Sequence, residues 1–213
     1  MSVKLTKGEK VSLKKSDGVA VKKLRVALGW NEIKSNGNNT KQSLFTSILK
    51  AIFGEIETEH DEMDCDASCI CVRNGKVDKK TLVYYGELEY KNAIKHSGDN
   101  LTGGKGDCEQ IVIKTNKLDD DIDKIYVFVN IYNSRQRHQT FGMVENAYIR
   151  VEDADTLEEL CKFELAEDYS DKTGIIAGEF VKNGRDWEFE ADGEGLKVDN
   201  IDDIVNILKE YKK

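Results

Sequence analysis

The sequence contains no proline among its 213 residues, so its turns must be formed by glycine, asparagine and aspartate. It also lacks any run of about 18 consecutive apolar residues, the length that a membrane-spanning helix requires. The opening segment MSVKLTKGEK has no apolar stretch behind its charges, so no signal peptide is expected. These absences predict a chain without a membrane span that remains in the cytoplasm.

Residues that support common catalytic sites are also scarce. The three histidines, His60, His96 and His138, have no second histidine or cysteine at zinc-binding spacing, and no Ser–His–acid arrangement or nucleophile elbow is present. The five cysteines form an odd number, and CDASCIC lacks the spacing of structural zinc sites. We expect reduced thiols, as in other cytoplasmic proteins. The sequence therefore predicts a protein that is not an enzyme.

Acidic residues outnumber basic ones, with 40 Asp and Glu against 32 Lys and Arg and a formal net charge of −8. This excess argues against nucleic acid as a partner, because the phosphate backbone carries the same sign of charge. It is compatible with the binding of cations. Since many cytosolic proteins are this acidic, the positions of the acids matter more than their number.

Most of the chain alternates apolar and polar residues with the period of a β-strand, as in KLRVALGW over residues 23–30. VRNGKV and FVKNGRDWEF place Asn-Gly between strand-like flanks, which predicts two tight hairpins. Further strands are expected in TLVYYGELEY, EQIVIK, KIYVFVNIY, AYIRVED, LCKFEL and GIIAGEFV. Roughly eight to ten short strands with tight turns predict an antiparallel two-sheet sandwich or a barrel. One mainly β domain is expected over residues 1–213.

Two segments carry the helical period instead. Residues 43–57 place Phe45, Ile48, Leu49, Ile52 and Phe53 on one face, which predicts an amphipathic helix. This apolar face must either pack on the sandwich or dock on another molecule, which would be a protein partner or a second copy of the chain. Residues 198–213 predict a C-terminal helix that has an apolar face and acids in its first turn.

The acids that could carry chemistry fall in two segments. In MDCDASCICV, Asp64 and Asp66 share one face of an expected strand at a spacing of about 6.5–7 Å, while the cysteines face the core. This pair forms either a solvated acidic face or one side of a cation site. In HSGDNLTGGKGDCEQIVI, Asp99 and Asp107 bracket glycines that let the backbone turn its carbonyls inward. Carboxylates, carboxamides and carbonyls are the hard oxygen ligands of Ca²⁺, whereas an ordinary glycine-rich loop would not explain the acids.

Two superficially similar patterns do not predict calcium sites. DCDAS lacks the central glycine and the distal glutamate of an EF-hand loop. DDDID at 119–123 lies between KL and KIYVFV, which favours a charged turn before a strand.

Taken together, the motifs resemble the TerD domain of tellurium-resistance and stress proteins. VSLKK and VALGW resemble the opening strands of that family, and DCDAS resembles its D-x-D-A-S strand. HSGDNLTGGKGDCEQI resembles the glycine-rich acidic loop of the family. RQRHQTFGMVENAYIRV and ELAEDYSDKTGIIAGEF resemble two of its later segments. The ordered matches cover most of the chain.

The resemblance implies a β-sandwich that binds Ca²⁺ at one end and acts in stress response or toxic-anion resistance by binding rather than by catalysis. The implied ligands are Asp64, Asp66, Asp99, Asn100, Thr102, Gly103, Asp107 and Glu109, with Glu167, Asp168 and Glu179 as supporting groups. Independently of the resemblance, Arg135 either recognises an anion or braces the acidic loop by pairing with its carboxylates. The five carboxylates among the implied ligands belong to Asp64, Asp66, Asp99, Asp107 and Glu109. Around one divalent ion they leave a net charge of about −3, whereas around two ions they leave about −1. Two calcium ions are therefore expected.

The chain departs from the family pattern in three places, the first of which is Asn133, where many members of the family carry an aspartate. Cys108 stands where the family loop usually has a second acid, and a thiol is a poor calcium ligand. Residues 31–62 form an insertion that contains the predicted helix. Two other functions stay open: a divalent-metal-dependent enzyme that uses the same acidic pocket, and a metal-free scaffold that presents the inserted helix.

Overall fold

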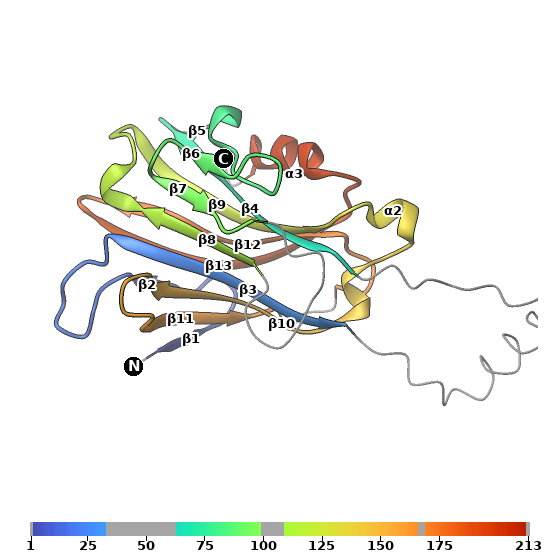
Figure 1. Cartoon of the computed structure of the whole chain (residues 1–213), viewed down its shortest axis with the longest axis horizontal. Coiled ribbons are helices and arrows are strands. Elements are labelled where there is room, and N and C mark those ends of the chain that lie inside the picture. The colour runs from blue at the N-terminus through green and yellow to red at the C-terminus, as the bar shows by residue number, and fades with distance from the viewer. Residues whose placement is uncertain (1, 33–62, 99–108, 166–168, 212–213) are drawn as a thin grey trace, which may run out of the picture.

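The computed structural model describes residues 2–32, 63–98, 109–165 and 169–211. Thirteen strands in these ranges form two sheets that pack face to face (Figure 1). The seven-stranded sheet has the order β1-β11-β10-β3-β8-β7-β6, and the six-stranded sheet has the order β2-β13-β12-β9-β4-β5. The predicted two-sheet sandwich is therefore confirmed.

The strands of the seven-stranded sheet are β1 (Val3–Leu5), β3 (Lys23–Glu32), β6 (Glu89–Tyr90), β7 (Ile94–His96), β8 (Glu109–Lys114), β10 (Val144–Asp153) and β11 (Glu159–Glu164). Those of the six-stranded sheet are β2 (Lys10–Ser12), β4 (Cys65–Arg73), β5 (Lys76–Val77), β9 (Ile122–Ile131), β12 (Gly174–Asn183) and β13 (Asp186–Leu196). The helices are α2 (Ser134–Arg137) and α3 (Ile201–Leu208), with 3₁₀ turns at Lys79–Thr81, Thr115–Lys117 and Phe141–Met143.

Neighbouring strands are antiparallel, except that β1 runs parallel to β11. Both hairpins predicted from Asn-Gly are present. In the β4–β5 hairpin, Asn74 and Gly75 both have positive φ angles, 49° and 73°, as a two-residue hairpin turn of the primed type requires. The second hairpin joins β12 to β13, whose last ladder pair is Asn183 with Asp186.

The main core lies between the sheets and follows the predicted alternation. Leu24, Val26, Leu28 and Trp30 of β3 are buried in one cluster with residues of β4, β8, β9, β10, β12 and β13. Cys65, Ala67, Cys69 and Cys71 of β4 belong to the same cluster, so the small soft residues of that strand face the core as predicted. The described cysteines form no disulfide.

A second apolar cluster lies on the outer face of the six-stranded sheet, under α3 (Figure 1). Ile204, Val205 and Leu208 of the helix are buried in this cluster together with Ile70, Val72, Tyr126, Phe128, Ile176 and Val198. The Asn200 side chain accepts a hydrogen bond from the Asp203 backbone N–H, and the Asp203 carboxylate accepts one from the Asn200 backbone N–H, which forms a capping box. The C-terminal helix is thus confirmed, with one face of the sheet as its partner.

The structure corrects one predicted strand. Residues 81–90 do not form a single strand but end a 3₁₀ turn, make bridges from Val83 to Cys69 and from Tyr84 to Glu87, and close with the two-residue strand β6. The prediction is wrong because part of this apolar segment covers the free edge of β4 instead of extending a sheet. DDDID forms the predicted charged turn, in which Asp119 and Asp121 pair with Arg73.

The insertion over residues 31–62 lies outside the described residues from residue 33 onward, and so does its predicted helix at 43–57. Among the described helices, none is long and apolar enough to cross a membrane.

Candidate metal centre

Asp64 and Asp66 are brought together at the start of β4, on the face turned away from the main core. Asp64 is 5% exposed and Asp66 is 1% exposed, so the alternative of a solvated acidic face is wrong. Ser68 follows on the same face of the strand and is fully buried. Because two buried carboxylates repel each other and lose solvation, this arrangement is costly without a compensating positive charge.

Asn130 adds an oxygen that the sequence did not reveal. It lies directly opposite Asp66 in the β4–β9 ladder, and its Nδ2 donates to Asp66 Oδ2 at 3.3 Å. Asn130 Oδ1 and Ser68 Oγ are buried and have no hydrogen-bond partner among the described residues. Buried oxygens of this kind need a donor or a cation. Asp64, Asp66, Ser68 and Asn130 therefore form a set of hard oxygen donors that fits Ca²⁺.

Glu109 and His96 lie at the free edge of β4, where they bind the backbone of Ala67. The Ala67 N–H donates to Glu109 Oε2 at 2.5 Å, and His96 Nε2 lies 3.0 Å from the Ala67 carbonyl oxygen. Both side chains are completely buried, and Nε2 lies 3.4 Å from Glu109 Oε2. The two acidic segments of the sequence are thus joined, because the first residue of β8 holds the strand that carries Asp64 and Asp66.

The rest of the free edge of β4 is closed in the same way. Cys69 exchanges two backbone hydrogen bonds with Val83, at 3.0 and 2.9 Å. The Cys71 N–H donates to Thr81 Oγ at 2.9 Å, and the Asp78 N–H donates to the Cys71 carbonyl. An edge strand with its backbone groups satisfied is protected from pairing with other chains and is held rigidly. The acidic pair therefore stands on a fixed strand.

Tyrosine rings lie beside the acidic pair. Tyr85 packs edge-to-face against Tyr84 and Tyr132, with ring centroids 5.1 and 5.6 Å apart. Burial raises the pKa of Tyr85, and the negative charges of Asp66 and Asp64 add to the shift. The Tyr132 N–H donates to the Asp64 carbonyl at 2.8 Å, which fixes the end of the acidic strand.

The other predicted site residues fall into two groups. Asp99, Asn100, Thr102, Gly103, Asp107, Glu167 and Asp168 lie outside the described residues. Glu179 pairs with Lys124 at 2.8 Å and lies opposite Tyr126, four residues along β9 from Asn130. That offset corresponds to about 13 Å of strand, so the structure does not bring Glu179 to the acidic pair. Within the described ranges, no three His, Cys, Asp or Glu side chains form a metal-binding group.

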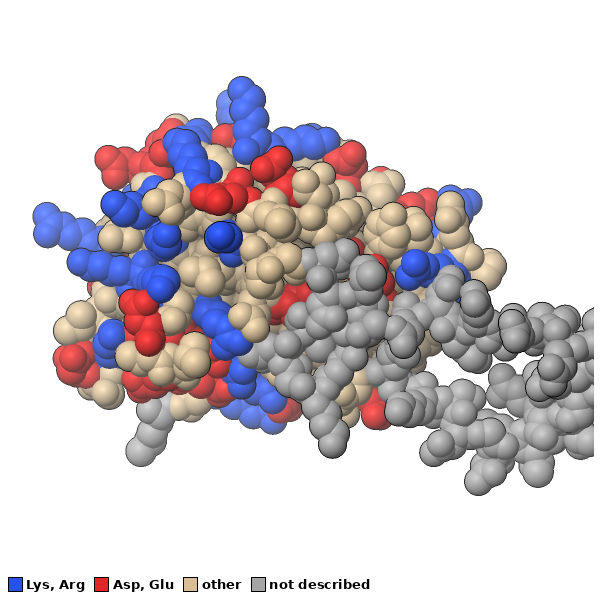
Figure 2. Space-filling view, in the orientation of Figure 1, with Lys and Arg blue, Asp and Glu red and all other residues tan. Residues whose placement is uncertain are grey.

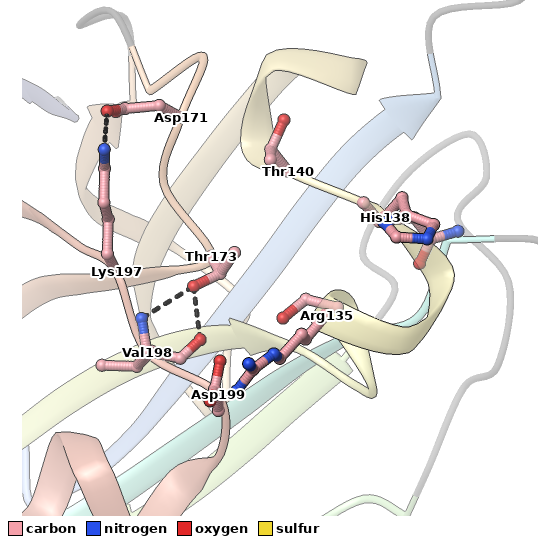
Figure 3. Close-up of a pocket in the computed structure, with 10 residues that line it drawn as sticks. Arg135, His138, Thr140, Asp171, Thr173, Lys197, Val198 and Asp199 are labelled. Atoms are coloured by element: carbon pink, nitrogen blue, oxygen red, sulfur yellow. Dashed lines mark hydrogen bonds and ion pairs between the residues drawn. The ribbon is translucent and has the colours of Figure 1, made fainter.

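A separate pocket of about 420 Å³ contains Arg135, the remaining predicted residue (Figure 3). Arg135 pairs with Asp199 at 2.7 Å, and Lys197 pairs with Asp171 at 2.5 Å. The Thr173 hydroxyl donates to the Val198 carbonyl and accepts from the Val198 N–H. The charges and the hydroxyl that line this pocket are therefore already used within the fold.

Local pairing also characterises the outer face of the seven-stranded sheet. Arg25 and Arg150 both pair with the buried Glu152, and Lys162 pairs with Glu164 at 3.5 Å. Figure 2 shows Lys and Arg side chains interleaved with Asp and Glu on the visible face of the molecule. On the outer face of the seven-stranded sheet, Arg25, Arg150 and Lys162 are thus paired with nearby acids.

Comparisons with known proteins agree with this architecture. The chain is 39% identical over 209 residues to stress response protein SCP2 of Bacillus subtilis (strain 168), and the aligned region covers 97% of this chain and 98% of that protein. It is 33% identical over 199 residues to tellurium resistance protein TerD of Serratia marcescens, with 92% of this chain and 91% of that protein covered.

A solved structure has the same fold. A homologue of the telluride resistance protein TerD from Streptomyces coelicolor A3(2) superposes with a TM-score of 0.62 at 19% identity, covering 85% of this chain and 94% of that one. The model of the TerD domain matches residues 1–208 of this chain. The chain is therefore a member of the TerD-domain family of stress-response and tellurium-resistance proteins.

Proposed function

We propose that this chain is a cytoplasmic calcium-binding protein of the stress response, and that it acts by binding rather than by catalysis. The observation that carries the proposal is the pair of carboxylates at Asp64 and Asp66, 5% and 1% exposed, next to the buried oxygens of Ser68 and Asn130. A divalent cation offsets the repulsion between the acids and satisfies the oxygens at the same time.

The remaining ligands are proposed to come from the glycine-rich segment, namely Asp99, Asn100, Thr102, Gly103 and Asp107. Glu109 already binds the Ala67 N–H, so in this proposal it anchors the end of that segment to β4. Asp64, Asp66, Asp99 and Asp107 then supply four carboxylates. Their charge balances two Ca²⁺ ions, and we propose two ions for this reason.

Hard oxygen donors also bind Mg²⁺, but the two ions make different demands. Ca²⁺ accepts six to eight oxygens in irregular geometry, whereas Mg²⁺ requires a near-ideal octahedron and keeps its water. Carboxylates on one strand combined with backbone carbonyls of a glycine-rich segment suit the first ion better. Selective binding of Ca²⁺ without turnover of a substrate is therefore the expected behaviour.

Thermal unfolding of chelator-treated protein tests the proposal. Calcium at a hundredfold excess over its Kd adds about 2.7 kcal/mol to the free energy of unfolding. We expect a clear rise in Tm with Ca²⁺ and a smaller rise with Mg²⁺. Equal shifts from the two ions would support a magnesium-dependent enzyme instead, and no shift from either would support a metal-free scaffold.

A further inference from the structure

We infer that His96 is a positioning residue for the proposed calcium site. It fixes the backbone of β4 at Ala67, between Asp66 and Ser68, and it also contacts Gly98 and Glu109. The inference rests on the proposed function, and it assigns a role to a histidine that is not itself among the proposed ligands.

The evidence is a set of three contacts made by one buried ring. His96 Nε2 lies 3.0 Å from the Ala67 carbonyl oxygen and 3.4 Å from Glu109 Oε2. The Gly98 N–H donates to His96 Nδ1 at 3.1 Å. Since Nδ1 accepts a hydrogen bond, Nε2 carries the hydrogen and donates it to the Ala67 carbonyl.

The partners of the His96 ring lie in the two acidic segments of the sequence. Ala67 stands between Asp66 and Ser68 in β4, so its peptide groups fix the backbone of both. Gly98 is the last described residue before residues 99–108, and Glu109 is the first one after them. A single imidazole therefore connects Ala67 of the acidic strand with Gly98 and Glu109.

Glu109 completes this connection, because it accepts the Ala67 N–H while His96 binds the carbonyl of the same residue. The two side chains together satisfy both backbone groups of Ala67 on the free edge of β4. An aliphatic side chain at position 96 would leave the buried Ala67 carbonyl and the half-buried Gly98 N–H without these partners. It would also loosen the backbone of β4 between Asp66 and Ser68, so calcium binding would have to fix that backbone at a cost in affinity.

A matched control exists on the same strand edge. Thr81 is completely buried, accepts from the Cys71 N–H at 2.9 Å and donates to the Asp78 carbonyl at 2.7 Å. Cys71 lies four residues from Ala67, which is about 13 Å along the strand. Thr81→Val therefore removes the same kind of edge contact at a distance from the acidic pair.

The experiment measures calcium affinity by isothermal titration calorimetry and the Tm without calcium for the wild type, His96→Leu and Thr81→Val. Both variants are expected to lower the Tm, but only His96→Leu is expected to weaken calcium binding, by about tenfold or more. Unchanged affinity in His96→Leu would overturn the inference. An equal loss of affinity in Thr81→Val would do the same, since the effect would then follow general stability.

Two milder variants cover the case in which His96→Leu fails to fold. His96→Gln can keep a donor near the position of Nε2, and His96→Asn can keep an acceptor near the position of Nδ1. Each variant should lose part of the calcium affinity. In His96→Gln the Gly98 amide should exchange faster, and in His96→Asn the amides should exchange faster along the part of the β4 edge that Thr81 does not contact. Wild-type affinity in both would overturn the inference, whereas a wild-type protein that binds no calcium would overturn the proposed function itself.

Discussion

Asp66 and Asn130 show how much of the candidate site depends on single atoms. Asp66 is 1% exposed, and its carboxylate accepts a hydrogen bond from the Asn130 amide at 3.3 Å. Asn130 Oδ1 is buried and has no hydrogen-bond partner among the described residues. An amide group neutralises no charge. A cation bound between these oxygens would offset the negative charge of Asp66 and give Asn130 Oδ1 a partner.

Asp66→Asn tests this assignment, because it removes one charge with little change in size. We expect calcium affinity to fall by about tenfold or more, which corresponds to about 1.4 kcal/mol or more of binding free energy. Calorimetric titration measures the change. Asp155→Asn, at an exposed acid paired with Lys23 at 2.7 Å, is the control and should bind calcium like the wild type. Equal affinities in the two variants would place the site elsewhere.

At this scale, sequence reasoning found the acids but not their partners. Asp64 and Asp66 are visible because they share one parity in a strand whose other face is small and apolar. Asn130 is a single amide in an apolar strand, and only the β4–β9 register places it opposite Asp66. The sequence likewise indicates no role for His96, because its partners Ala67 and Glu109 are distant in sequence and meet only in the fold.

Among the elements, α3 depends on a contact beyond its last turn. The Tyr211 hydroxyl donates to Asp192 Oδ1 at 2.8 Å, and the ring packs edge-to-face on Tyr126 at 6.1 Å. Burial raises the pKa of Tyr211 well above its usual range, and the hydrogen bond to Asp192 adds to the shift. The hydroxyl therefore stays protonated and remains a donor to this buried carboxylate.

Tyr211→Phe keeps the ring and removes the donor, so it should lower the free energy of unfolding by about 1–3 kcal/mol. Urea unfolding measures the loss. Tyr84→Phe is the control, since Tyr84 is half-buried and packs on Tyr85 in a similar edge-to-face contact. A Tyr211 variant as stable as the wild type would show that the apolar face alone holds α3.

The base of the β4–β5 hairpin is held by charge. Arg73 pairs with Asp78, Asp119 and Asp121, and its hydrogen bond to Asp121 holds the pKa of that carboxyl below its usual value. A pKa that is lowered in the folded state stabilises the protein above the unfolded value of about 3.9. That contribution is lost as the pH falls through the folded pKa.

Arg73→Met should therefore raise the pKa of Asp121 toward the usual value. Titration of the carboxyl carbons by NMR measures this directly, with Lys95→Met, at an exposed lysine of β7, as the control. The stability lost in Arg73→Met should also shrink as the pH falls from neutral to below about 3.9, because the carboxylates then become protonated in the unfolded state while Arg73 keeps them ionised in the folded wild type. A constant loss over that range would mean that the arginine acts by packing and not by charge.

Elements with a strong period were predictable, and those shaped by tertiary contacts were not. The alternation in β3 and β9, both Asn-Gly hairpins and the capped helix α3 follow from local rules. Residues 81–90 carry the apolar and aromatic composition of a strand, but Val83 pairs only with Cys69 at the edge of β4. Such a short bridge has the same composition as a strand, so the period cannot distinguish them.

For the whole molecule, the fold and the family are established while the calcium site is proposed. The TerD-domain match over residues 1–208 and the two-sheet architecture agree. The strand order could not be read from the sequence, because β3 pairs with β8 and β10 although β4 follows it in the chain. The same order brings the start of β8 against β4 and so joins the two acidic segments.

Calorimetric titration of chelator-treated, full-length protein with Ca²⁺ tests the central claim most directly. We predict saturable binding of two ions per chain, and weaker binding of Mg²⁺ under the same conditions. The two ions follow from four proposed carboxylate ligands, Asp64, Asp66, Asp99 and Asp107, whose charge they balance. A titration without binding heat, repeated at a second temperature to exclude a zero enthalpy, would contradict the account.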